Sequence, residues 1–150
     1  MELTMGLLLP REEVTIPMAR HICRYALREI GVDDDCREDI EVALTEACTN
    51  VLDHSGPGDA YEVELSVEDG RCFIRIIDKG HGFDSETIRA SDPAAEGGRG
   101  LELIRALVDR VKFESKPEAG TLVHLEKDLA YCDGAPAQRR AATRSGEPRG

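Results

Sequence analysis

The strongest constraint on the fold is a pair of alternating apolar segments, residues 61–67 and 72–78, joined by an Asp-Gly pair. Alternation of apolar and polar residues is typical of a strand that buries one face. Asp69-Gly70 is favoured in the two-residue turns of β-hairpins. The sequence therefore predicts two adjacent antiparallel strands, and the rest of the chain has to cover their apolar face.

Two amphipathic segments ahead of this hairpin predict helices. Apolar residues recur at spacings of three and four over residues 17–30, and Gly31 supplies a stop. A second segment with this period runs from the aspartates at 33–35, whose carboxylates suit a helix start, to about Asp53. We expect a first strand over residues 2–9.

The second half of the chain predicts a long loop, a helix and another hairpin. Residues 84–99 are polar, rich in small side chains and without a lasting period, as in a functional lid. A helix is expected from Gly100, and residues 110–115 and 120–127 flank a Pro-Glu-Ala-Gly turn. This order of elements predicts an α/β (α+β) two-layer sandwich, with helices on one face of a mixed, mostly antiparallel sheet.

The 150 residues fit one domain. Large apolar residues are scarce beyond Leu129, so we expect a folded domain over residues 1–129 and a disordered tail over residues 130–150. No run approaches the ~20 apolar residues that a spanning helix needs, and the first residues do not resemble a secretory signal. We therefore expect a cytoplasmic protein that does not bind membranes.

The formal net charge of −11 disfavours nucleic acids and anionic membranes as partners. A phosphate ligand would have to be held by backbone N–H groups at a helix start and by a divalent cation, rather than by a basic patch. The five cysteines are odd in number and contain no C-x-x-C pair. This pattern argues against a disulfide framework and against a zinc site.

Glu46 and Asn50 lie four residues apart on the second predicted helix, and His54 continues their line. They share a face that borders the apolar stripe. A carboxylate and a carboxamide directed inward favour a ligand or metal site. The alternative for so short a pattern is an ordinary solvated helix edge.

Asp78 ends the row of core-facing residues in the hairpin's second strand, where an ionised carboxylate is costly unless a donor satisfies it. Gly80 and Gly82 follow and permit close approach of the backbone to a planar ligand, although a tight turn is the alternative. The run Gly97-Gly98-Arg99-Gly100 offers N–H groups to an anion at a helix start, with a plain hinge as the alternative. Its spacing is neither that of a Walker loop nor that of a dinucleotide fingerprint.

Taken in order, residues 46–50, 78–82 and 98–100, together with Gly120-Thr121, resemble the motifs of the GHKL family of ATP-binding domains. Within that family the chain is similar to the bacterial anti-sigma factor serine/threonine kinases. The resemblance covers about residues 3–127 and implies the Bergerat-type ATP-binding fold. The cofactors that it implies are ATP and Mg²⁺.

The resemblance also implies a role for each matching side chain. Asp78, assisted by Thr121, would bind the adenine amino group, and Asn50 would bind the Mg²⁺ that bridges the phosphates. His54 would lie along the cofactor-binding side of the same helix. Glu46 would act as the general base that orients the hydroxyl group of a protein serine or threonine.

The glycine-containing motifs would surround the cofactor by the same resemblance. Gly80 and Gly82 would shape the adenine pocket, and Gly98 and Gly100 the lid over the phosphates. Arg99 would contact a phosphate directly.

The function implied is that of a kinase that uses Mg-ATP to phosphorylate a STAS-type anti-sigma antagonist protein and that also sequesters a sigma factor. The alternative is a non-catalytic module in which ATP only shapes a partner-binding surface. Glu46 favours the enzyme without deciding the question. A binding domain without nucleotide would require every motif to arise by coincidence. The resemblance further implies a homodimer formed through the N-terminal strand and helix.

Overall fold

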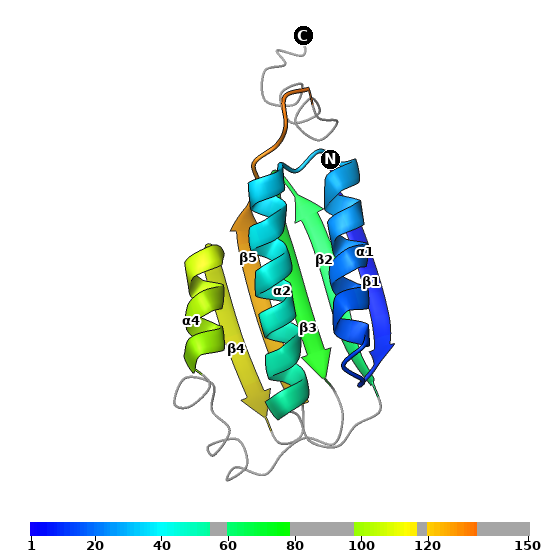
Figure 1. The fold of residues 1–150 in the computed structure, drawn as a ribbon, viewed down its shortest axis with the longest axis vertical. Coiled ribbons are helices and arrows are strands. Elements are labelled where there is room, and N and C mark those ends of the chain that lie inside the picture. Colours follow the sequence, from blue (N-terminus) through cyan, green and yellow to red (C-terminus); the bar gives the residue numbers. More distant parts are fainter. Residues whose placement is uncertain (55–59, 79–97, 117–119, 135–150) are drawn as a thin grey trace.

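The computed structural model describes residues 1–54, 60–78, 98–116 and 120–134. Within these ranges a five-stranded sheet has the order β1-β2-β3-β5-β4, and three helices cover one of its faces (Figure 1). The elements are β1 (Leu3–Pro10), α1 (Thr15–Glu29), α2 (Asp34–His54), β2 (Ala60–Glu68), β3 (Arg71–Asp78), α4 (Gly98–Leu107), β4 (Arg110–Lys116) and β5 (Gly120–Asp128). The predicted two-layer architecture is confirmed.

Every strand pairing among the described residues is antiparallel, which is simpler than the mixed sheet expected. The hairpin predicted from Asp69-Gly70 is the β2–β3 pair, and both turn residues have positive φ, 51° and 76°. A type I′ turn requires this backbone conformation. The register of β3 on β5 places Asp78 opposite Thr121, so two predicted site residues meet at one end of the two inner strands.

α2 lies between α1 and α4 and packs on β3 and β5 (Figure 1). The apolar stripe predicted for this helix is buried against the sheet, and its residues are Ile40, Ala43, Leu44, Ala47 and Val51. Since Glu46 and Asn50 border that stripe, the packing of α2 sets the direction of both side chains. No helix in the described part of the chain has the length and apolarity needed to cross a membrane.

The five cysteines are free thiols, and four of them are buried. Burial raises the pKa of Cys23 and of Cys72 to about 12 and also raises that of Cys48. These thiols therefore stay protonated at neutral pH and behave as small core residues. Cys132 is the exposed one.

The chain beyond β5 returns along the link between α1 and α2. The Asp33 N–H donates to the Ala130 carbonyl and the Cys132 N–H to the Gly31 carbonyl, each over 2.8 Å, and Val32 and Tyr131 form an antiparallel bridge. The domain boundary expected at residue 129 precedes this pairing. That boundary is predicted from the scarcity of large apolar side chains beyond Leu129. The pairing of residues 130–132 is made by backbone hydrogen bonds, which do not depend on such side chains. Residues 135–150 of the expected tail lie outside the described residues.

Truncation after Leu129 is expected to lower the melting temperature, whereas truncation after Gly134 is the matched control that keeps the pairing. The first change removes two backbone hydrogen bonds and the packing of the half-buried Tyr131 against the core. At about 1 kcal/mol for each bond, a fall of roughly 4–8 °C follows. Thermal unfolding followed by circular dichroism measures it. Equal melting temperatures for the two truncated chains would contradict the stabilising role of residues 130–134.

Candidate functional site

Four polar side chains are buried in the described part of the chain, those of Thr15, Asn50, Asp78 and Thr121. Three of them, Asn50, Asp78 and Thr121, are residues that the sequence predicts to bind the cofactor. Burying polar groups costs free energy unless a partner satisfies them. Because α2 and β3 end, and β5 begins, at the same end of the molecule (Figure 1), these side chains mark one region as a candidate binding site.

Asp78 and Thr121 form the strand part of this site. Each is 1% exposed, and they are register partners at the end of β3 and the start of β5. An ionised carboxylate only accepts hydrogen bonds, whereas a threonine hydroxyl both donates and accepts. The pair therefore suits a ligand edge that carries an amino group.

An ion pair that the sequence does not predict holds Asp78 in place. The Nε atom of Arg11 lies 3.0 Å from Oδ2 of Asp78. A terminal nitrogen of the same guanidinium donates a 2.8 Å hydrogen bond to the carbonyl of Leu52, in the last turn of α2. The available signal was the core-facing position of Asp78, since a buried carboxylate needs a compensating donor or cation. That signal does not reveal which basic residue supplies it.

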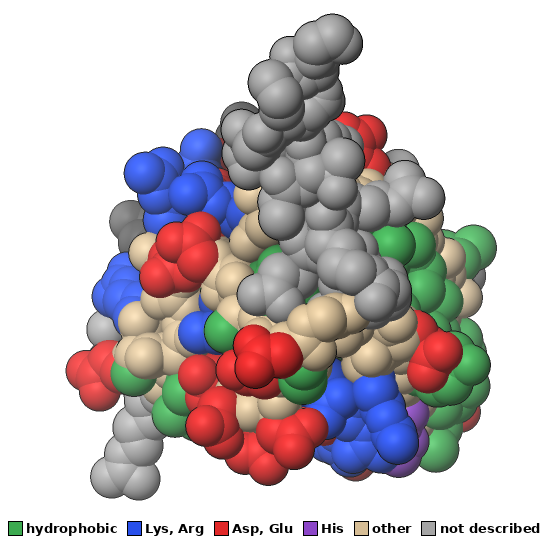
Figure 2. Space-filling view, turned by 90° about the horizontal axis from the view of Figure 1, so that it is seen from above, with side chains coloured by type: hydrophobic (Ala, Val, Ile, Leu, Met, Phe, Trp, Pro, Cys, Tyr) green, Lys and Arg blue, Asp and Glu red, His purple; other side chains and the backbone are tan. Residues whose placement is uncertain are grey.

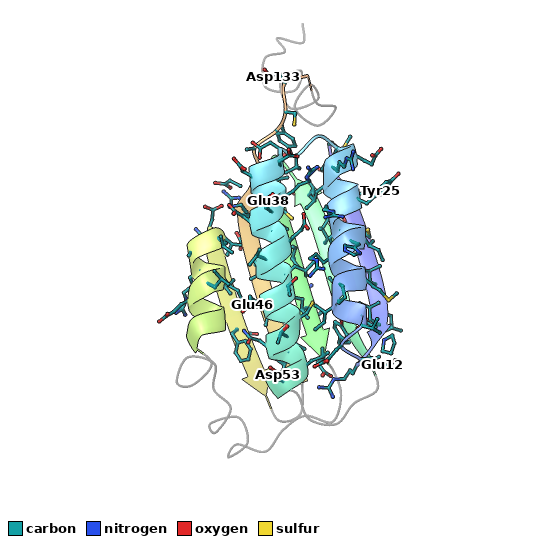
Figure 3. All side chains as sticks on the ribbon, in the orientation of Figure 1. Glu12, Tyr25, Glu38, Glu46, Asp53 and Asp133 are labelled. Carbon is teal, nitrogen blue, oxygen red and sulfur yellow. The ribbon has the colours of Figure 1, made fainter. Side chains whose placement is uncertain are left out.

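Glu46, Asn50 and Gly100 come together where α2 packs on α4. A Cβ atom placed on Gly100 would lie 3.3 Å from Oε1 of Glu46, 3.4 Å from Oδ1 of Asn50 and 3.6 Å from Nδ2 of Asn50. Figure 3 shows Glu46 on α2, the helix beside α4. Both side chains therefore reach the first turn of α4, as their four-residue spacing predicts.

Asn50 has the properties of a magnesium ligand. It is 8% exposed, and its Nδ2 atom has no hydrogen-bond partner among the described residues. A carboxamide oxygen is a hard ligand, and Mg²⁺ is commonly held by one or two protein oxygens together with phosphates and waters. The described residues contain no cluster of three or more His, Cys, Asp or Glu side chains suited to a metal. A single carboxamide oxygen of this kind fits an ion whose other ligands are phosphate oxygens and waters.

α4 begins at Gly98, two residues earlier than expected, so Gly98, Arg99 and Gly100 form its first turn. The free N–H groups and the positive end of the helix dipole lie there, as the predicted anion site requires. The side chains of Arg99 and of His54 fall outside the described part of the structure. Gly80 and Gly82 also lie outside the described residues, and their roles stay predictions.

A comparison with known families identifies the family to which this fold belongs. Residues 9–127 match the family model described as the histidine kinase-like ATPase domain. The chain belongs to this family. The matched range contains all the predicted site residues and Arg11, and the resemblance drawn from the motifs is confirmed.

Named relatives of this ATPase domain narrow the comparison. The serine-protein kinase RsbW of Halalkalibacterium halodurans is 30% identical over 137 residues, covering 84% of this chain and 83% of that protein. The anti-sigma F factor of Bacillus licheniformis is 32% identical over 102 residues, covering 61% and 69%. The solved structure of the RsbU and RsbW domains of Rv1364c from Mycobacterium tuberculosis has a TM-score of 0.67 at 23% identity, covering 85% of this chain and 32% of that longer one. This structural likeness confirms the expected fold.

Gly100→Ala is expected to weaken ATP binding about tenfold, or by about 1.4 kcal/mol. The new methyl group would crowd the Glu46 and Asn50 oxygens at 3.3 and 3.4 Å. Stability should change little, because the higher helix propensity of alanine offsets the crowding. Isothermal titration calorimetry and thermal unfolding measure the two effects.

Gly6→Ala is the matched control for this substitution, since nothing lies within 4 Å of its added Cβ atom. Its ATP affinity should equal that of the wild type. Wild-type affinity in the Gly100 variant would show that the first turn of α4 does not border the nucleotide.

Proposed function

We propose that this chain is an anti-sigma factor protein kinase. It binds Mg-ATP, phosphorylates a serine or threonine of a STAS-type antagonist protein and sequesters a sigma factor, all in the cytoplasm. The observation that carries the proposal is the convergence of Glu46 and Asn50 on the first turn of α4. Support comes from the relatives, since proteins about 30% identical over most of the chain are named serine-protein kinases.

The nucleotide would bind with its base at the end of β3 and the start of β5, and with its phosphates at the first turn of α4. Asp78 accepts a hydrogen bond from the amino group of adenine, and Thr121 borders the same base. Free N–H groups at the start of α4 receive the phosphates. Asn50 would hold a Mg²⁺ ion, which would neutralise phosphate charge that a chain of net charge −11 does not offset by itself.

Glu46 is placed to act on the incoming hydroxyl group. It is half-buried, and its Oε1 atom lies beside the first turn of α4, where the phosphates would bind. The substrate oxygen bonds to the γ-phosphorus, the bond between that phosphorus and the β–γ bridging oxygen breaks, and ADP leaves. The hydroxyl proton passes to Glu46. Most of the catalysis comes from positioning and from charge neutralisation.

A second surface supports the binding of a protein partner. An exposed apolar stripe runs along α1 from the residue before it: Val14, Met18, Ile22 and Tyr25 are 63%, 48%, 37% and 66% exposed. Leu8 on β1 is 72% exposed. Figure 2 shows hydrophobic side chains gathered at the edge of the molecule where α1 and β1 lie. Such a patch marks a protein contact, with a partner or with a second copy of the chain. The same surface would serve the alternative, a non-catalytic module gated by ATP.

Asn50→Ala is expected to weaken the binding of Mg-ATP while leaving metal-free ATP binding nearly unchanged. The affinity for Mg-ATP should fall about tenfold or more, because even the loss of a side chain that only hydrogen-bonds to a metal ligand lowers metal affinity by that factor. Calorimetry with and without Mg²⁺ measures the difference. Thr49→Ala is the control, because the Thr49 hydroxyl donates to the Thr45 carbonyl within α2. Equal losses in both titrations would remove Asn50 from the metal shell.

Glu46→Gln is expected to slow phosphoryl transfer by about 10²–10⁴-fold with unchanged Mg-ATP affinity, because the amide keeps the shape but not the basic oxygen. Single-turnover phosphorylation of a STAS-type antagonist from the same genome measures the step, beside calorimetric ATP binding. Glu41→Gln is the matched control, since Glu41 pairs with Arg24 on α1. A wild-type chain that binds ATP and a sigma factor yet phosphorylates no antagonist would favour the non-catalytic module.

A further inference from the structure

Arg11 connects the two halves of the proposed nucleotide site. Its guanidinium reaches Asp78 on β3 at 3.0 Å and the Leu52 carbonyl on α2 at 2.8 Å. The Arg11 and Asp78 side chains are 13% and 2% exposed, so water screens their attraction weakly. Figure 3 labels Glu12 and Asp53, the chain neighbours of Arg11 and Leu52, at the same end of the molecule.

A buried polar network fixes the turn that carries Arg11. The Glu12 N–H donates to the Pro10 carbonyl over 2.8 Å, which closes a three-residue turn with Arg11 at its centre. The hydroxyl of Thr15 lies 3.0 Å from the Pro10 carbonyl and 2.6 Å from that of Glu12, and 2.8 Å from the Tyr61 hydroxyl. Thr15 is the fourth buried polar residue, and holding this turn accounts for its burial.

Arg11 contacts the Asp78 carboxylate from the β1 side of β3. Arg11 follows β1, whereas Thr121 borders Asp78 from β5, and the sheet order β1-β2-β3-β5-β4 puts these strands on opposite sides of β3. α4, with its phosphate-binding turn, lies on the β4 and β5 side of α2 (Figure 1). A nucleotide that extends from Asp78 to α4 would therefore reach the carboxylate from the side away from Arg11.

We propose that Arg11 is a positioning residue that sets the base selectivity of the nucleotide site by fixing the orientation of the buried Asp78 carboxylate as a hydrogen-bond acceptor. The inference rests on the proposed ATP site and deepens it. A carboxylate selects a purine with an amino group at position 6 and rejects one with a carbonyl there, because both oxygens would be acceptors. Without the guanidinium, the carboxylate loses the contact that directs its oxygens, and its preference for an amino group over a carbonyl falls.

The test compares the affinities of ATP and ITP, whose bases differ at position 6. Arg11→Gln and Arg11→Met remove the charge, and each should lower the ratio of ATP affinity to ITP affinity about tenfold, the discrimination given by a well-placed hydrogen bond to a base edge. Arg11→Lys keeps the charge and should retain most of the wild-type ratio. Arg24→Met, at an exposed arginine that pairs with Glu41, is the control and should leave the ratio unchanged.

Three outcomes separate the possibilities. A lowered ratio in the neutral variants with rescue by lysine supports the proposal, and the glutamine variant decides if the methionine variant does not fold. Equal losses of ATP and ITP affinity, with an unchanged ratio, would give Arg11 a structural role only and overturn it. A wild-type chain that binds neither nucleotide would instead overturn the proposed function, whatever Arg11 does.

Discussion

The packing of α2 against the middle strands is the contact on which the rest of the structure depends. Ala43 and Ala47 are fully buried and let the helix approach β3 and β5 closely, and Ile40, Leu44 and Val51 fill the remaining space. The other edge of the helix carries Glu46 and Asn50, and its last turn offers the Leu52 carbonyl to Arg11. The side chains of the candidate site are therefore oriented by an apolar interface to which they contribute little.

The same construction makes the site a weak point for stability. Asp78 lies at the end of a strand whose other inward residues are apolar, and a buried charge that loses its partner is destabilising by about 3–5 kcal/mol. Arg11 and Asp78 thus depend on each other, and substitution of either removes this ion pair from the other. In a domain of ordinary stability such a loss is a large share of the total, so changes at Asp78 affect folding as well as binding.

Local patterns in the sequence account for most of the fold and for the core of the candidate site. The period of α2 and the Asp69-Gly70 turn were predictable because each depends on neighbouring residues. The shared helix face of Glu46 and Asn50 was predictable for the same reason, because it follows from their four-residue spacing. The position of Gly100 at a helix start was predictable from the Gly-Gly-Arg-Gly run. The Arg11 ion pair and the pairing of residues 130–132 with the α1–α2 link were not, because both join segments far apart in sequence. A charge pair and a backbone bridge leave no periodic signal on either segment.

The distribution of thiols makes the native chain suited to site-selective labelling. Maleimide dyes react with thiolates, and the four buried cysteines are shielded by the core, whereas Cys132 is exposed. Backbone pairing with Gly31 fixes the position of Cys132. The Leu129 N–H bonds to the Gly70 carbonyl in the β2–β3 turn, so this attachment point lies at the end of the sheet opposite Asp78. A single fluorophore there reports tumbling and complex formation without touching the nucleotide end of the molecule.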